Sequence, residues 1–435
     1  MKSSKLIIIL FLIVIGISIP LIMTFSSQET DIVEISSQNK IEGEQTVFTF
    51  QKDEGITKLS GDGALTFDKT DYLMGKQSLK LTTDGQYGYE QILKTNISPP
   101  LDFREKYLKA WIKISNPVYV DKIWIKVSHN DLVDYKTYWI HQWASTPSAK
   151  YFQRDTWSPI TISLTQSKNF GIVDLSKINA IEIVVLDNGR GPVTVWLNSL
   201  TLVENNSEGI LTFTFDDAPV TQYTNAVPIL AKYNFSATTY INTDYIGNRE
   251  GKLNLNQIKE MEFSYGWDIS AHTLSHLDLT RRGNDEKIKK EILESKQYLI
   301  DNGFSKGVEH FAYPFGSFDY DYTMELVKKH FKSARGIRGN IETLPPADDY
   351  RLRVLYIFNY TSPDTVLKRV DKAIENGDWL ILVNHGIVDS NANHPHSKYL
   401  KSKFEKIVEG IDNSGIKVMT VSEVYEQIIE KKDMP

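Results

Sequence analysis

Strand-like and helix-like patterns alternate throughout the second half of the chain, and this alternation limits the fold more than any other feature. Patterns typical of strands lie at residues 211–217, 237–242, 267–272, 310–313, 333–336, 354–358, 379–384 and 417–421. Patterns typical of helices lie between them, at residues 222–233, 255–263, 285–302, 320–330, 363–376 and 398–413. Repeated strand–helix units form a parallel sheet, and this one is long enough to close into a distorted (β/α) barrel. We therefore predict an α/β domain over residues 206–435.

The preceding residues, 46–205, differ because strands follow one another without intervening helices. Alternating apolar residues mark strands at 107–114, 122–127, 157–164, 180–185 and 193–202. Many strands at short spacing predict an all-β sandwich. Their order and the last strand resemble the jelly-roll modules that bind carbohydrate in polysaccharide enzymes, so a jelly-roll-like domain is expected. Trp139 and Trp143 lie in an irregular stretch and are the candidates for stacking on sugar rings.

Two adjacent carboxylates, Asp216 and Asp217, end the first strand of the predicted barrel, and Pro219 prevents that strand from continuing. In parallel barrels the reacting groups gather at the carboxyl ends of the strands. Neighbouring residues at a strand end point in different directions, so one carboxylate can bind a metal while the other accepts a proton. Alone, such a pair is most often a solvated turn, and its interpretation depends on the rest of the chain.

Two histidines, His272 and His276, follow the strand at 267–272. Residues four apart lie on the same face of a helix, so we expect one helical turn to bring the two imidazoles together. Two neutral imidazoles and one carboxylate supply three ligands and leave positions open for water and substrate. Such a set is typical of catalytic metal sites.

The segments TFDD at 214–217 and HTLSH at 272–276 together resemble the first two motifs of the NodB-type polysaccharide deacetylases, carbohydrate esterase family 4. The resemblance covers about residues 208–425. It implies that Asp217, His272 and His276 bind a divalent metal, usually zinc in this family. It also implies that Asp216 is the general base.

The segment HFAYPFG resembles the third motif of this family, which lines the substrate groove. The resemblance implies that Tyr313 donates its backbone N–H to the oxyanion and that Pro314 lies beside the substrate. Most members carry an arginine where this chain has Ala312, and a subset places one later in the chain. We expect Arg353 to be that replacement, with Arg351 as the second candidate.

The segment LILVNHG at 380–386 resembles the last motif. It implies that His385 is the general acid and that Val383 lies near the acetyl methyl group. Such a set suits hydrolysis of an acetamide by metal-activated water, because metal binding lowers the pKa of water from about 15.7 towards ~7. The expected substrate is an extracellular N-acetylated polysaccharide of the N-acetylglucosamine type.

Three other classes of protein match part of this pattern. A glycosidase needs two acids roughly 5 to 10 Å apart and no metal, which the histidine pair disfavours. An amidohydrolase that acts on a different amide fits the same residues. A non-catalytic sugar-binding surface protein is expected to have lost a ligand, the base or the acid, and all of these are present.

The N-terminal residues predict export. Lys2 and Lys5 precede an uncharged apolar run at 6–25, close to the roughly 20 residues that a membrane-spanning helix needs. Residues 1–25 are therefore a signal peptide or a membrane anchor, and the lack of a clear cleavage site favours the anchor. Residues 26–45 are expected to be a polar linker that leaves the rest of the chain at the cell surface.

The composition excludes some partners and chemistries. The chain has no cysteine, which rules out disulfides, thiolate zinc sites and cysteine nucleophiles. The net charge of −6 argues against nucleic acid as a partner. The oligomeric state, the glycan and the metal stay open.

Overall fold

The computed structural model describes residues 44–51, 54–142, 151–205, 207–280, 283–390 and 396–430. The chain divides into two compact units, Met1–Gln45 and Thr46–Pro435, and the described residues belong almost entirely to the second. The predicted signal or anchor at 1–25, most of the linker and Trp143 lie outside the described residues. Within the described ranges, no helix is both long and apolar enough to cross a membrane.

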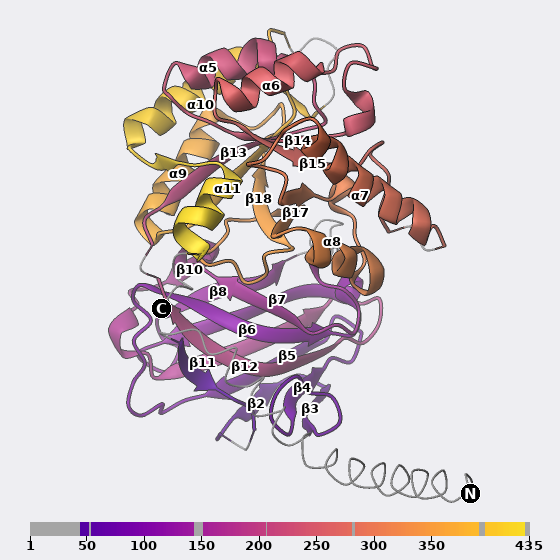
Figure 1. Ribbon diagram of the computed structural model, residues 1–435. Coiled ribbons are helices and arrows are strands. Elements are labelled where there is room, and N and C mark those ends of the chain that lie inside the picture. Colours follow the sequence, from indigo (N-terminus) through magenta and orange to yellow (C-terminus); the bar gives the residue numbers. More distant parts are fainter. Residues whose placement is uncertain are drawn as a thin grey trace, which may run out of the picture. The chain divides into compact units, whose positions relative to one another are not determined.

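The N-terminal half of the second unit is built from two antiparallel sheets (Figure 1). Strand β1 (Glu44–Phe48) belongs to the first sheet through its pairing with β12 (Thr194–Glu204). The first sheet has the order β3 (Ala64–Asp68), β4 (Ser78–Thr82), β12 (Thr194–Glu204), β6 (Lys106–Ile114) and β9 (Ser158–Ile162). The second has the order β10 (Ser167–Phe170), β8 (Tyr135–Gln142), β7 (Val120–Ser128), β11 (Ala180–Asp187), β5 (Tyr89–Lys94) and β2 (Thr57–Ser60).

The two sheets share one hydrophobic core, which confirms the predicted all-β sandwich. Ile112 and Leu197 of the first sheet and Ile125 and Ile183 of the second belong to it and are at most 2% exposed. Alternate residues of each strand face this core, as expected for strands with one buried face. Trp139 was expected outside the regular strands but lies in β8, half-buried against Trp124 at a ring-centroid distance of 5.4 Å.

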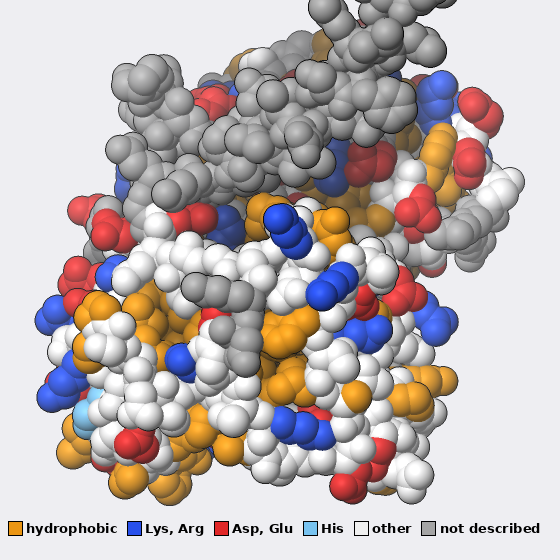
Figure 2. Space-filling view, turned by 90° about the horizontal axis from the view of Figure 1, so that it is seen from below, with side chains coloured by type: hydrophobic (Ala, Val, Ile, Leu, Met, Phe, Trp, Pro, Cys, Tyr) orange, Lys and Arg blue, Asp and Glu red, His pale blue; other side chains and the backbone are white. Residues whose placement is uncertain are grey.

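The surface of the molecule mixes side chains of both charges. On the face shown in Figure 2, acidic and basic side chains are interspersed, and hydrophobic side chains lie between them. Exposed apolar residues of the sandwich include Leu59, Leu73 and Tyr87. Single exposed apolar residues of this kind are normal on protein surfaces and need no ligand to explain them.

The C-terminal half is a closed parallel barrel, as predicted. Its strands, in order around the ring, are β13 (Ile210–Asp216), β14 (Thr238–Ile241), β15 (Asp268–Ala271), β16 (His310–Ala312), β17 (Ser333–Gly339), β18 (Leu352–Tyr356) and β19 (Trp379–Asn384). The ring closes because β13 pairs in parallel with both β19 and β14. The short strand β22 (Lys417–Val418) also pairs with β13, and β20 (Gly386–Val388) pairs with β21 (Lys398–Leu400).

Helices surround the strands of the barrel (Figure 1). They are α5 (Val227–Ala231), α6 (Leu255–Phe263), α7 (Asp285–Asp301), α8 (Glu325–His330), α9 (Pro363–Asn376), α10 (Lys401–Ser414) and α11 (Val421–Val424). A π-helical turn at Gln222–Ala226 leads directly into α5. Capping explains several of their ends. For example, α6 begins at a capping box between Asn254 and Gln257, and α9 ends at Gly377 in the left-handed conformation.

Strand alternation separates two hydrophobic clusters of the barrel. Phe213 packs against Phe404 of α10 and lies in the cluster between strands and helices. Ile210 belongs to a second cluster, which includes Val383 and other inward-facing residues of the ring. Because successive side chains point to opposite faces, Asp216 lies on the same inner side as Ile210. The strand therefore delivers this carboxylate to the inside of the barrel at its carboxyl end.

A buried ion pair stabilises the side of the barrel formed by β18. Arg353 is fully buried, and its Nε lies 3.1 Å from both carboxylate oxygens of Glu342, which is itself 1% exposed. The guanidinium also donates to the carbonyl of Thr161 in β9, at 2.7 Å. Arg353 thus satisfies a buried carboxylate of the barrel and a backbone group of the sandwich at once.

We expect Arg353→Ala to lower the free energy of unfolding by about 3–5 kcal/mol, because it leaves the Glu342 carboxylate buried without its partner. The matched control is Lys372→Ala, which removes an exposed pair with Glu375 on α9. That change is expected to cost no more than about 1 kcal/mol. Urea denaturation of both variants checks the prediction, and equal effects of the two would contradict it.

Candidate active site

The two acidic residues at the end of β13 face different partners, as predicted. Asp216 is 4% exposed, and its Oδ1 accepts a hydrogen bond from Nη2 of Arg335 in β17. Asp217 has a backbone φ of 67°, a left-handed conformation that turns its side chain toward two histidines. The carbonyl of Asp217 also accepts a hydrogen bond from Nζ of Lys252. One strand end therefore holds two carboxylates in separate environments.

The pairing with Arg335 decides the charge of Asp216. Burial raises the pKa of this carboxyl, but the Arg335 guanidinium, together with His272 and His385, outweighs burial and holds the pKa below its usual value. The guanidinium of Arg335 also lies over the ring of Tyr240, at 4.6 Å from its centroid. Asp216 is thus ionised and can accept a proton.

Arg335, rather than Arg353 or Arg351, is the arginine that pairs with Asp216. Arg353 pairs with Glu342, and Arg351 pairs with Asp348 at 2.8 Å. Leu352 and Val354 face the interior cluster of the barrel, so the arginines that alternate with them point outward. Arg335 lies in the strand predicted at 333–336, but the residue pattern of that strand does not indicate which face of the strand points into the barrel.

Three predicted metal ligands come together. Asp217, His272 and His276 each offer a ligand atom, and these atoms lie within 4.8 Å of one another. Oδ1 of Asp217 lies 3.7 Å from Nε2 of His272 and 3.4 Å from Nε2 of His276. This oxygen is buried and has no hydrogen-bond partner among the described residues. A carboxylate oxygen without a hydrogen-bond partner and two imidazole nitrogens that converge on it fit a divalent cation.

The orientation of His272 also suits metal binding. Its Nδ1 lies 2.7 Å from the carbonyl of Ala312, so Nδ1–H donates to that carbonyl and Nε2 keeps its lone pair toward Asp217. Burial lowers the pKa of His272 to about 4, which keeps the ring neutral near pH 7. The third motif therefore contributes a backbone carbonyl to the metal site.

The histidine pair does not lie on a helical turn, contrary to our expectation. Residues 272–276 form a loop in which Thr273 and His276 have φ values of 66° and 64°. The loop closes because the N–H of His276 donates to Oγ1 of Thr273, at 3.0 Å. It is anchored by Glu291 of α7, whose carboxylate accepts from both the N–H and the hydroxyl of Ser275. The local turn, rather than helical periodicity, brings the two imidazoles together.

His385 completes the group from the end of β19. Its Nε2 lies 3.7 Å from Oδ2 of Asp217 and 3.2 Å from the hydroxyl of Tyr356. Val383, two residues earlier, is fully buried on the inner side of the same strand. Tyr356 is a neighbour of His385 that the sequence analysis missed, because the strand was predicted to continue to residue 358 whereas β18 ends at Tyr356.

The third motif is arranged differently from the expected oxyanion site. The N–H of Tyr313 donates to the carbonyl of Arg335, at 3.1 Å, and is therefore engaged within the sheet. Pro314 is buried, and Phe315 follows it with a φ of 58°. The ring of Phe315 is 53% exposed and lies edge-on to His276, with centroids 4.3 Å apart. Phe315, rather than Tyr313, faces the histidine pair.

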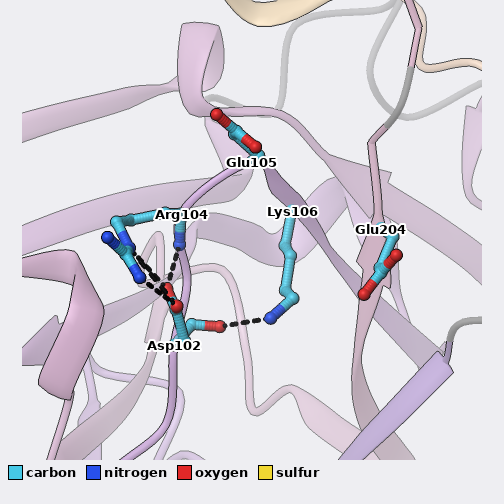
Figure 3. A pocket seen from close by; sticks show the side chains of 5 residues that line it. All are labelled: Asp102, Arg104, Glu105, Lys106 and Glu204. Carbon is cyan, nitrogen blue, oxygen red and sulfur yellow. Dashed lines mark hydrogen bonds and ion pairs between the residues drawn. The ribbon is translucent and has the colours of Figure 1, made fainter.

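A separate pocket of about 350 Å³ lies on the sandwich (Figure 3). It is lined by Asp102, Arg104, Glu105, Lys106 and Glu204. Arg104 pairs with the carboxylate of Asp102 at 2.7 Å, and Lys106 donates to the carbonyl of Asp102 at 3.0 Å. The charges of Arg104 and Asp102 thus compensate each other, and the residues of the predicted motifs lie in the barrel rather than here.

The fold and this geometry define a class of protein: parallel (β/α) barrels that gather carboxylate and imidazole side chains at the carboxyl ends of their strands. Within that class, the family model described as polysaccharide deacetylase matches residues 204–332. Residues 204–332 are therefore similar to the polysaccharide deacetylases, which bears out the resemblance drawn from the motifs over this part of the chain.

Individual relatives match part of the chain. The poly-β-1,6-N-acetyl-D-glucosamine N-deacetylase of Staphylococcus epidermidis is 31% identical over 169 residues, which are 36% of this chain and 57% of that protein. The enzyme of the same name from Staphylococcus aureus is 29% identical over 147 residues, 31% of this chain and 50% of that protein. The chain thus spans about half the length of these curated relatives. A Streptococcus pyogenes deacetylase solved with acetate is 28% identical, covers 36% of this chain and 68% of its own, and has a TM-score of 0.32.

We expect the full chain to bind one divalent cation and His272→Ala to weaken that binding strongly. Losing a direct ligand should exceed the roughly 10–100-fold effect that is typical of losing an outer hydrogen-bond partner. Competition with a chromophoric chelator measures the affinity. The control is His330→Ala at the end of α8, which is expected to leave the affinity unchanged. Equal affinities in the wild type and His272→Ala would contradict the metal site.

Glu291 is expected to act as a positioning residue for His276. Glu291→Gln keeps the volume of the side chain but removes one of the two acceptors that hold Ser275, so metal affinity should fall roughly 10–100-fold. Glu294→Gln is the matched control, because Glu294 lies on the exposed face of the same helix and pairs only weakly with Lys290. The same chelator competition applies, and an unchanged affinity in Glu291→Gln would refute the role.

Proposed function

We propose that this protein is a metal-dependent enzyme that removes N-acetyl groups from a polysaccharide of the N-acetylglucosamine type outside the cell. One observation carries the proposal. Asp216, the set Asp217–His272–His276 and His385 converge at the carboxyl end of a barrel whose sequence matches the polysaccharide deacetylases. Two relatives named for poly-β-1,6-N-acetyl-D-glucosamine suggest that glycan as the first substrate to test.

Asp216 is the proposed general base. Its pairing with Arg335 keeps the carboxylate ionised, and the fixed guanidinium orients it inside the barrel. From this position it takes a proton from the water that attacks the acetamide carbonyl. Arg335 is thus a positioning residue for the base.

Asp217, His272 and His276 are the proposed ligands of the cation, for which we favour Zn²⁺ because neutral imidazole and carboxylate are ligands that zinc takes. A divalent cation held there would supply Lewis-acid chemistry to the water and the carbonyl oxygen. The chain's own contribution is to hold the three ligand atoms in place and to leave the remaining positions open.

His385 is the proposed general acid. Its imidazole lies beside Asp217 and the Tyr356 hydroxyl, where it can donate a proton to the leaving nitrogen as the C–N bond breaks. Acetate and an amino sugar are the products. Val383, on the inner side of β19 below His385, is the proposed contact for the acetyl methyl group.

The proposed location is the cell surface or the surrounding medium. The apolar run at 6–25, after two lysines, would export the chain and, if it is not cleaved, anchor it to the membrane. The sandwich would then lie between the anchor and the enzyme in sequence. A role for Trp139 and Trp143 in binding sugar stays part of this proposal.

The test is acetate release from β-1,6-linked N-acetylglucosamine oligomers by the full chain, with chelator and with zinc added back. Release should require the metal. Asp216→Asn should lower kcat by about 10²–10⁴-fold with the metal still bound, because a carboxamide cannot accept the proton. Asp278→Asn, which removes a carboxylate that bonds to Thr280 within a turn, is the control.

Each alternative outcome has a distinct meaning. Bound metal without acetate release would favour an amidohydrolase with a different amide substrate. Neither bound metal nor acetate release would leave a sugar-binding surface protein. Metal-independent release that persists in Asp216→Asn would refute the assigned roles.

A further inference from the structure

A glutamine of the sandwich binds the third-motif loop of the barrel, which we define as residues 313–320, from the end of β16 to the start of the π-helical turn at Tyr320–Met324. Nε2 of Gln153 donates to the carbonyl of Phe318, at 3.1 Å, and Oε1 of Gln153 accepts from the N–H of Tyr320, at 3.3 Å. Gln153 lies between β8 and β9, 165 residues before Phe318. One carboxamide thus ties two backbone groups of the loop to the sandwich.

The stretch of the sandwich around Gln153 has further contacts with the barrel. The carbonyl of Tyr151 accepts hydrogen bonds from the hydroxyl of Tyr320, at 3.2 Å, and from Nη1 of Arg351, at 2.9 Å. The guanidinium groups of Arg351 and Arg338 lie over the ring of Tyr151, at 4.4 and 4.3 Å from its centroid. The backbone beside Gln153 is therefore held against the barrel by its own contacts, so the glutamine offers a fixed attachment to the loop.

The third-motif loop needs such an attachment because its backbone is unfavourable at Phe315. The φ of 58° is left-handed, a conformation that residues other than glycine keep only where the surrounding structure holds them. The barrel holds the first half of the loop, since Gly316 packs so closely on β17 that an added Cβ would lie 2.5 Å from Cγ1 of Ile337. The second half, at Phe318, is held by Gln153 of the sandwich.

The conformation of this loop places Phe315 against a candidate metal ligand. The ring of Phe315 lies edge-on to His276, with centroids 4.3 Å apart. The His276 side chain also contacts Asp217 and the ring of His272, which are the other members of the ligand set. Whereas a hydrogen bond to the carbonyl of Ala312 orients His272, Phe315 contacts His276 from outside the ligand set and limits how its ring can turn.

A glutamine between two packed halves of a chain can also serve only to join them, and Gln166 illustrates that simpler role. Its Nε2 donates to the carbonyl of Ile341, at 2.9 Å, and its Oε1 accepts from Nη1 of Arg353, at 3.4 Å. Neither partner belongs to the candidate active site. Gln153 differs because the segment that it binds leads within three residues to Phe315.

We propose that Gln153 is a positioning residue of the candidate active site, which holds the third-motif loop so that Phe315 keeps His276 in the orientation of a metal ligand. In this arrangement the sandwich supports the metal site directly, a role that does not require it to bind sugar. The inference rests on the proposed function through the ligand role of His276, and it is independent of which glycan is the substrate.

Hydrogen–deuterium exchange of the full-length protein, followed by mass spectrometry, tests the first step. Gln153→Ala removes both hydrogen bonds to the loop, so the amides of residues 313–323 should exchange roughly two- to tenfold faster. Gln166→Ala is the matched control, because it removes a similar bond from the sandwich to the barrel and should leave exchange in the loop unchanged. Unaltered exchange in β6 shows that both variants are folded. Unchanged exchange of the loop in Gln153→Ala would overturn the proposal.

Competition between the protein and a chromophoric chelator for zinc tests the second step. Gln153→Ala should weaken zinc binding roughly three- to tenfold, less than the roughly 10–100-fold that is typical of a direct outer partner, because it acts through Phe315. Phe315→Ala should also weaken binding, and the double variant should bind no more weakly than Phe315→Ala alone, since residues that act through one another are not additive. Additive losses, or an equal loss in Gln166→Ala, would contradict the proposed route.

The two measurements separate failure of this inference from failure of the proposed function. If the wild type binds no zinc, the proposed metal site fails, and hydrogen exchange alone decides the role of Gln153. Faster exchange of the loop in Gln153→Ala but not in Gln166→Ala would retain Gln153 as the support of the loop and reject the metal site. Unchanged exchange in both variants would reject both.

Discussion

The buried pair of Asp216 and Arg335 is the interaction on which the rest of the site depends. Both side chains lie inside the barrel, where an unpaired charge would be costly, so each compensates the charge of the other. The pair joins β13 to β17, two strands that are not neighbours in the sheet. Closure of the ring therefore places the two charges in contact, and the contact orients the Asp216 carboxylate.

The metal-ligand set depends on backbone strain that this closed ring supports. Asp217, Thr273, His276 and Phe315 all have left-handed backbone conformations, which are uncommon for residues other than glycine. They lie in the loops that follow β13, β15 and β16. With these backbone conformations, the side chains of Asp217 and His276 converge with that of His272, and the carbonyl of Ala312 orients the His272 ring. A residue without a reactive side chain thus contributes to the site.

Much of the fold could be predicted because its signals are local. The strand predicted at 379–384 is β19, and that predicted at 237–242 contains β14. The hydrophobic periods of strands (two residues) and helices (about 3.6 residues) are properties of short segments, so they can be recognised in the sequence without knowledge of tertiary contacts. Trp139 was misplaced because β8 is defined by its pairing with β7 and β10 rather than by its own composition.

The sequence by itself determined which chemical groups are present and where along the chain they occur: two carboxylates at a strand end, a histidine pair and a last histidine. Only the tertiary structure decided which arginine meets Asp216, because Arg335 lies 119 residues from its partner and faces inward, whereas Arg353 faces outward. It also decided that the N–H of Tyr313 is engaged and that a loop, not a helix, joins the histidines. The physical reason is that alternation along a strand is local, whereas the choice of its inner face depends on closure of the whole ring.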